Sequence, residues 1–149
     1  MAMLRSLLLF FIVFSMGDAD DTCQYGWTQF GSRCYKFIFF HETWITAEVK
    51  NCIALHANLA SVHSREENDF LLELLPSTTT QCWLGNQDAA EEGQWLWSDG
   101  TPYDYSNWCS GEPNNLNVEN CGELNWASDH CWNDESCSNS MGYVCAKDL

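Results

Sequence analysis

The chain has 149 residues, of which 46% are apolar and 14% aromatic. This length and composition predict one packed domain and exclude a disordered chain. The formal net charge of −15, from 21 acidic and 6 basic residues, would repel phosphate groups, so it excludes nucleic acid and an anionic membrane surface as partners. The excess carboxylates suit either solubility or a hard cation, and charge alone favours solubility.

The N-terminus has the pattern of a secretory signal peptide. A short basic segment ending at Arg5 precedes an unbroken apolar run over residues 7–14, and small residues follow. The run is shorter than the ~20 residues that a membrane-spanning helix needs. We therefore predict a signal peptide over residues 1–17, cleaved between residues 17 and 20, and a secreted, extracellular protein without a membrane span.

The cysteine content agrees with an oxidising compartment. All nine cysteines follow the signal, which predicts a disulfide framework. Zinc sites usually contain C-x-x-C pairs or clusters of Cys and His, and neither pattern occurs here. Because nine is odd, at least one cysteine lacks a partner within the chain and is either a free thiol or linked to another chain.

The first elements after the signal are predicted to be strands. Cys23 and Cys34 frame an aromatic segment that indicates a hairpin, with a turn at Gly31-Ser32, and residues 35–40 are also β-prone.

Two helices are predicted next. Over residues 42–56 apolar side chains recur at three- and four-residue steps, and over residues 64–75 a second such face follows the capping box Ser64-Arg65-Glu66-Glu67 and stops at Pro76. The two apolar faces consist of Trp44, Ala47, Cys52 and Leu55, and of Phe70, Leu71, Leu74 and Leu75.

The second half of the chain is predicted to consist of short strands and one long loop. Residues 82–85, 94–97 and 142–145 are strand-like, whereas residues 103–120 are polar and irregular. A loop of this length is usually functional or disordered, and its Trp, Tyr and flanking Cys residues favour an ordered one. Helices followed by short strands indicate the α+β class.

Two short motifs in this half offer oxygen ligands. Glu112-Pro113-Asn114 is followed by Glu119, and Trp132-Asn133-Asp134 comes later in the chain. Calcium takes six to eight oxygens. Five side chains and the Asp134 carbonyl would leave two positions for hydroxyls of a ligand. A cis Glu112-Pro113 bond, which proline permits at modest cost, would direct Glu112 and Asn114 towards one ion. Taken alone, each tripeptide is also an ordinary polar turn.

With these motifs in place, the sequence resembles the C-type lectin-like domain family over residues 23–146, and within it the branch of fish ladderlectins and type II antifreeze proteins. The resemblance rests on Trp83-Leu84-Gly85, the segment Trp95-Leu96-Trp97-Ser98-Asp99-Gly100, Asn107-Trp108 and the two oxygen-rich motifs. It implies a C-type lectin-like fold with two helices, short antiparallel sheets and a long calcium-binding loop, stapled by disulfides.

The same resemblance implies the site. Its calcium and carbohydrate ligands are Glu112, Asn114, Glu119, Asn133 and Asp134, and the Glu-Pro-Asn form is associated with mannose-type sugars that carry vicinal equatorial hydroxyls. A second calcium site maps near Asp88, Glu92, Asn115, Glu119 and Asn120, where two amides replace frequent carboxylates and should weaken binding. The implied disulfides are Cys23–Cys34, Cys52–Cys145, Cys121–Cys137 and Cys109–Cys131. Cys82 is left as a buried free thiol or as an interchain link in a homo-oligomer.

The resemblance favours a secreted, calcium-dependent lectin acting in innate recognition of microbial glycans. The alternative is ice binding on the same fold, as in type II antifreeze proteins, although the long loop has little Thr and the Glu-Pro-Asn motif is intact. A third alternative is a lectin-like domain that binds protein. None of the four His residues lies in a nucleophile motif, so an enzyme is not expected.

Overall fold

The computed structural model describes residues 22–149. The predicted signal peptide at residues 1–17 therefore lies outside the described residues. Within residues 22–149 no helix is both long enough and apolar enough to cross a membrane.

One mixed sheet forms the centre of the domain, with strand order β1-β2-β8-β4-β6-β7. Its strands are β1 (Thr28–Phe30), β2 (Arg33–Glu42), β3 (Asn58–Leu59), β4 (Cys82–Gln87), β5 (Leu96–Trp97), β6 (Cys121–Leu124), β7 (Asn133–Glu135) and β8 (Met141–Asp148). All pairs are antiparallel, as expected, except β4 with β8, which is parallel. The hairpin and the strands predicted at residues 35–40, 82–85, 94–97 and 142–145 are all present, with shifted ends.

The first predicted helix is present but begins later than residue 42. Glu42 pairs with Met141 in the sheet, so the helical segment follows it as a π-helix η1 (Thr46–Cys52) and a 3₁₀ turn η2 (Ile53–Leu55). Trp44, Ala47 and Cys52 are buried as the periodicity predicts.

The second helix, α1 (Arg65–Leu74), starts as its capping sequence predicts. The Ser64 side chain accepts a hydrogen bond from the Glu67 N–H. The reciprocal half of the capping box is absent, because the Glu67 carboxylate accepts instead from the His63 N–H at 2.6 Å, from Arg33 and from the Tyr35 hydroxyl. Glu67 therefore ties the start of α1 to β2.

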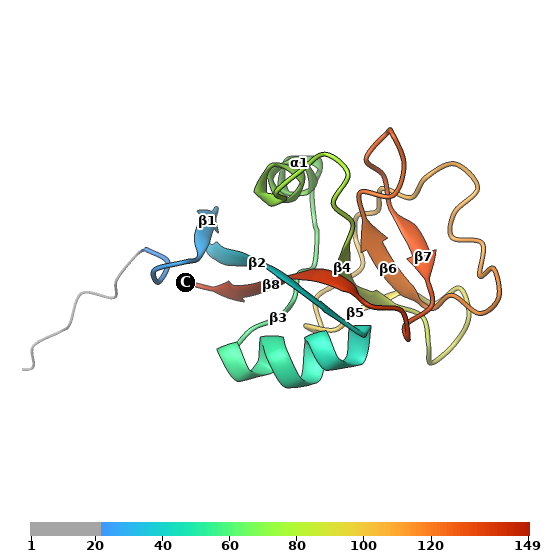
Figure 1. Cartoon of the computed structure of the whole chain (residues 1–149), viewed down its shortest axis with the longest axis horizontal. Coiled ribbons are helices and arrows are strands. Elements are labelled where there is room, and N and C mark those ends of the chain that lie inside the picture. The colour runs from blue at the N-terminus through green and yellow to red at the C-terminus, as the bar shows by residue number, and fades with distance from the viewer. Residues whose placement is uncertain (1–21) are drawn as a thin grey trace, which may run out of the picture.

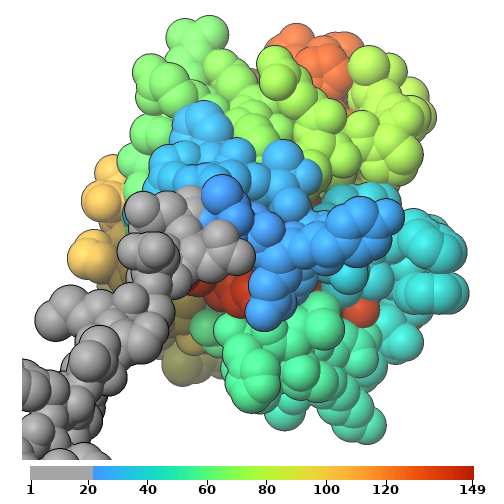
Figure 2. Space-filling model, turned by 90° about the vertical axis from the view of Figure 1, so that its left-hand side faces the viewer, coloured from blue at the N-terminus to red at the C-terminus, as the bar shows by residue number. Residues whose placement is uncertain are grey.

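The two helical segments cover opposite faces of the sheet (Figure 1). Seen from the end of the molecule, β1 and β2 cross between α1 and the first helix, and little of β8 is visible (Figure 2). Side chains alternate along β8, so Val144 faces the α1 core, whereas Tyr143 and Cys145 face the other. Burial of both faces explains why short strands form a stable sheet.

Four disulfides staple this framework: Cys23–Cys34, Cys52–Cys145, Cys109–Cys131 and Cys121–Cys137. They are the four pairs that the resemblance implies. Cys82 is a free thiol with 0% exposure on β4, and burial raises the pKa of its thiol well above the usual range. A disulfide to a second chain would require β4 to leave the sheet, so the burial argues against that alternative.

Candidate functional site

Backbone pairing brings the two oxygen-rich motifs together. The Cys109 N–H donates to the Trp132 carbonyl and the Trp132 N–H donates to the Asn107 carbonyl, both at 2.8 Å. The Cys109–Cys131 disulfide lies beside these bonds. The start of the long loop is therefore fixed against the segment that enters β7.

The Glu112-Pro113 peptide bond is cis, the arrangement that would direct Glu112 and Asn114 towards one ion. The Asn114 amide nitrogen donates to Glu112 Oε1 at 2.9 Å. The amide and the carboxylate of this motif consequently lie side by side, with one amide hydrogen of Asn114 still free to donate.

Asp134 joins the second motif to the first. Its side chain is buried, and its two carboxylate oxygens accept from the Asn114 N–H at 3.0 Å and from the Asn115 N–H at 2.7 Å. The structure therefore brings Glu112, Asn114 and Asp134 into one cluster.

Glu119 closes the loop on itself. Its Oε2 accepts from the Leu116 N–H at 3.1 Å, and its own N–H donates to Asn115 Oδ1 at 2.8 Å. The Leu116 N–H also donates to Asn114 Oδ1 at 2.8 Å. Shared contact with Leu116 places the side chains of Glu119 and Asn114 near each other.

The carboxylates of this cluster repel one another. Burial raises the pKa of Glu112, and the close approach and charge of the Asp134 carboxylate, together with the charge of Glu119, raise it further. Burial, followed by the charges of Asp134 and Glu135, raises the pKa of Glu119. Glu112 Oε2 is buried and has no hydrogen-bond partner within residues 22–149. Such an arrangement is unfavourable for anions alone and favours a cation.

A cation at this place has to use more than carboxylates. Within the part of the chain that the structure describes, no three His, Cys, Asp or Glu side chains form a metal-binding group by themselves. The expected set contains two amides and a backbone carbonyl besides its carboxylates. Calcium accepts such neutral oxygens readily, so the chemistry of the donors fits this ion.

Asn133 is positioned by a residue that the sequence analysis did not identify. The Asn133 side chain is 4% exposed, and its Nδ2 donates to Glu123 Oε1 at 2.9 Å. Glu123 faces Asn133 across the β6–β7 pair and is itself buried, which raises the pKa of its carboxyl to about 7. Because this bond holds the amide nitrogen, it fixes which side of Asn133 presents oxygen.

Three of the residues expected at a second calcium site lie together. Asp88 is 2% exposed, and its oxygens accept from the Gly93 N–H at 2.8 Å and, with the amide turned towards it, from Asn120 at 3.0 Å. Partial desolvation raises the pKa of the Glu92 carboxyl, and the negative charge of the neighbouring Asp88 raises it further. The Asn115 side-chain oxygen is used by Glu119. Asp88 thus has a structural use in joining two loops.

Comparison with known proteins adds the family relationship. The family model described as the lectin C-type domain matches residues 41–147. Ladderlectin from Oncorhynchus mykiss is 47% identical over 81% of this chain and 65% of its own length. The galactose-specific lectin nattectin from Thalassophryne nattereri is 38% identical over 88% of this chain and 84% of its own length.

Solved structures with the same fold include lectins and antifreeze proteins. The herring type II antifreeze protein has a TM-score of 0.81 at 35% identity, covering 85% of this chain and 99% of its own. A calcium-independent type II antifreeze protein has a TM-score of 0.79 at 36% identity, covering 85% of this chain and 95% of its own. The cow CD23 carbohydrate-recognition domain was solved in the presence of a GlcNAc2Man3 oligosaccharide. It has a TM-score of 0.79 at 37% identity, covering 87% of this chain and 98% of its own.

Proposed function

The chain belongs to the C-type lectin domain family, and from this premise we propose that it is a secreted, calcium-dependent lectin for mannose-type sugars. Its family comprises non-enzymatic domains that bind carbohydrate or ice, so the expectation that the chain is not an enzyme is confirmed. Residues 23–146 form the binding domain in this proposal, and residues 1–17 form a signal peptide cleaved between residues 17 and 20.

The observation that carries the proposal is the unpaired oxygen at the centre of the site. Glu112 Oε2 is buried without a hydrogen-bond partner in residues 22–149, next to the carboxylates of Asp134 and Glu119. Buried polar atoms are nearly always paired. A calcium ion would satisfy this oxygen and remove the repulsion among the three carboxylates.

The residues that would hold the ion are Glu112, Asn114, Glu119, Asn133 and Asp134. Bound calcium would supply coordination positions for two vicinal hydroxyls of a sugar. Glu112 would accept a hydrogen bond from one of these hydroxyls. Asn114 would donate its second amide hydrogen to the other. Asp134 orients the loop by holding the N–H groups of Asn114 and Asn115.

Two comparisons point to different sugars. CD23 was solved with an oligosaccharide that contains mannose, whereas nattectin is named as galactose-specific. The intact Glu112-Pro113-Asn114 order and its carboxylate–amide bond support equatorial hydroxyls of the mannose type. A secreted domain with this specificity fits innate recognition of microbial glycans.

Retention of the mature chain on immobilised mannose and galactose, with calcium and then with excess chelator, tests the proposal. We expect retention on mannose that chelator releases and that Asn114→Ala abolishes. Gln29→Ala removes an exposed amide on β1 and should retain full binding. Retention on galactose alone would overturn the proposed mannose-type specificity. No retention on either sugar would overturn the proposal that the chain is a lectin.

Ice binding is the second candidate because the chain also resembles type II antifreeze proteins. The long loop between Tyr103 and Asn120 contains no Thr, which argues against a flat, Thr-rich ice-binding face. Thermal hysteresis and ice-crystal shaping by the same preparation would decide between the two functions. We expect neither effect.

A further inference from the structure

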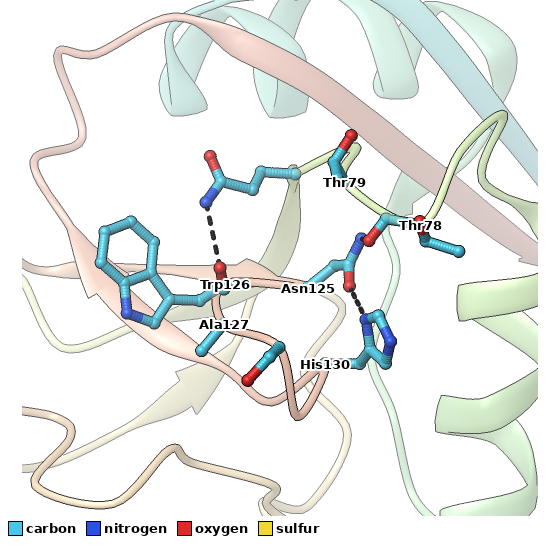
Figure 3. Close-up of a pocket in the computed structure, with 8 residues that line it drawn as sticks. Thr78, Thr79, Asn125, Trp126, Ala127 and His130 are labelled. Carbon is cyan, nitrogen blue, oxygen red and sulfur yellow. Dashed lines mark hydrogen bonds between the residues drawn. The ribbon is translucent and has the colours of Figure 1, made fainter.

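A surface hollow of about 600 Å³ lies apart from the calcium ligands. It is formed by the loop that joins β6 to β7 and by the segment that precedes β4, and Figure 3 shows it with Trp126 on one side and His130 on another. Its lining includes none of the five residues of the expected calcium site.

The hollow has no Asp, Glu, Lys or Arg in its lining, although the chain carries a formal charge of −15. Its polar groups are hydroxyls, amides and an imidazole. Four other hollows on residues 22–149 each include at least one Asp, Glu, Lys or Arg. Neutrality here is therefore a local property of this surface, and it suits an uncharged polar ligand.

The polar atoms of the hollow have unused capacity. No hydrogen bond within residues 22–149 uses the hydroxyls of Thr78 and Ser128, the side-chain oxygen of Gln81 or the indole N–H of Trp126. Hydroxyls both donate and accept, the amide oxygen accepts and the indole donates. This mixture complements the hydroxyls of a sugar, which also donate and accept.

Trp126 adds an apolar surface at the rim. Its side chain is 45% exposed, so an indole face is accessible to a ligand. A large aromatic ring with a polar N–H combines apolar contact with hydrogen bonding, and the C–H face of a pyranose ring is its natural complement.

The hollow is also held in shape before any ligand arrives. Asn125 is buried, its amide donates to the carbonyls of Thr78 and Thr80 at 3.1 and 2.8 Å, and its oxygen meets His130 Nδ1 at 2.5 Å. The backbone N–H of Trp126 donates to the backbone carbonyl of Cys131 at 2.9 Å. Pre-organisation of this kind lowers the entropic cost of binding.

We propose that this hollow is a second saccharide subsite, which binds one neutral sugar unit without calcium. The sugar packs its apolar face on Trp126 and exchanges hydrogen bonds with Thr78, Gln81 and Ser128. A chain with both subsites contacts a branched or extended glycan at two points. The second contact increases avidity without any further domain.

Amide NMR of the mature chain in excess chelator tests this subsite independently of the calcium site. The probes are methyl β-glucoside and methyl β-glucuronide, which share one ring and differ by a carboxylate. We expect saturable shifts of the Trp126 indole and of the amides around Thr78 and Asn125 with the glucoside, with a dissociation constant on the order of 10 mM. The glucuronide should bind more weakly, because no Lys or Arg lines the hollow to pair with its carboxylate.

Trp126→Ala should weaken glucoside binding about tenfold, with amide dispersion showing that the domain still folds. Tyr25→Ala removes an aromatic side chain that is fully exposed elsewhere and should change nothing, and Asn114→Ala should leave these shifts intact. Absence of saturable shifts, persistence of them in Trp126→Ala, or equal binding of the glucuronide would overturn the subsite. None of these outcomes depends on calcium-dependent retention on mannose.

Discussion

Removal of the Cys109–Cys131 disulfide should cost both stability and calcium affinity. The bond closes a chain segment with a sequence separation of 22. Loop-closure entropy then gives a loss of about 3.4 kcal/mol in the free energy of unfolding at 25 °C. Cys23–Cys34, with a separation of 11, gives about 2.8 kcal/mol by the same relation. The double variants Cys109→Ser/Cys131→Ser and Cys23→Ser/Cys34→Ser should therefore have similar urea midpoints.

The two double variants should differ in function. Cys109 lies three residues before Glu112, and Cys131 lies two residues before Asn133, whereas Cys23–Cys34 staples the far end of the sheet. Loss of the first bond leaves only hydrogen bonds, such as those of Trp132 with Cys109 and Asn107, to hold the two segments together, so the ligands should be less well positioned. We expect calcium affinity to fall about tenfold in this variant only.

Urea denaturation and calorimetric calcium titration of both double variants measure the two effects. Equal calcium affinity in the two variants would show that the disulfide has no role in positioning the ligands. A loss of stability below about 1 kcal/mol for either variant would contradict the loop-closure estimate.

Three further predictions concern the support of Asn133, the cap of α1 and the buried thiol of Cys82. Glu123→Leu removes the acceptor that holds the Asn133 amide and keeps a side chain of similar size, so calorimetry should show calcium binding about tenfold weaker or more, while a circular-dichroism spectrum equal to wild type shows that the fold is retained. Ser64→Ala removes the cap of α1 and should lower the free energy of unfolding by about 1 kcal/mol in urea, with Ser138→Ala, a change on an exposed loop, as the neutral control. The Cys82 thiol should resist alkylation in the folded chain and react as the single free thiol after denaturation without reductant; a disulfide-linked dimer on a non-reducing gel would contradict its burial.

The helices were predictable because their signals are local. The Ser64 cap, the apolar steps and Pro76 define α1 within one or two residues. The start of the first helix was predicted too early because Glu42 belongs to β2 and pairs with Met141 of β8. That pairing joins residues almost a hundred positions apart, so no local pattern reports it.

Two strands of the site were not predicted at all. β6 has only four residues and β7 only three, and the polar pair Asn133-Asp134 in β7 does not have the alternation that indicates a strand. These side chains are nevertheless buried, because Asp134 accepts from the N–H groups of Asn114 and Asn115 and Asn133 donates to Glu123. A strand whose buried side chains are polar is therefore missed by a pattern that looks for alternating apolar residues.

The expected ligands can be identified from sequence motifs, whereas the residue that supports them can be identified only from the folded structure. Glu112, Asn114 and Asp134 belong to short motifs, and the cis peptide and backbone pairing then bring them together. Glu123 acts only because the β6–β7 register places it opposite Asn133. A shift of one residue would turn Glu123 to the other face and leave the Asn133 amide without its acceptor. Motifs therefore identify the groups that would touch the ion, whereas the register decides whether they are held in place, and Glu123→Leu separates these two contributions.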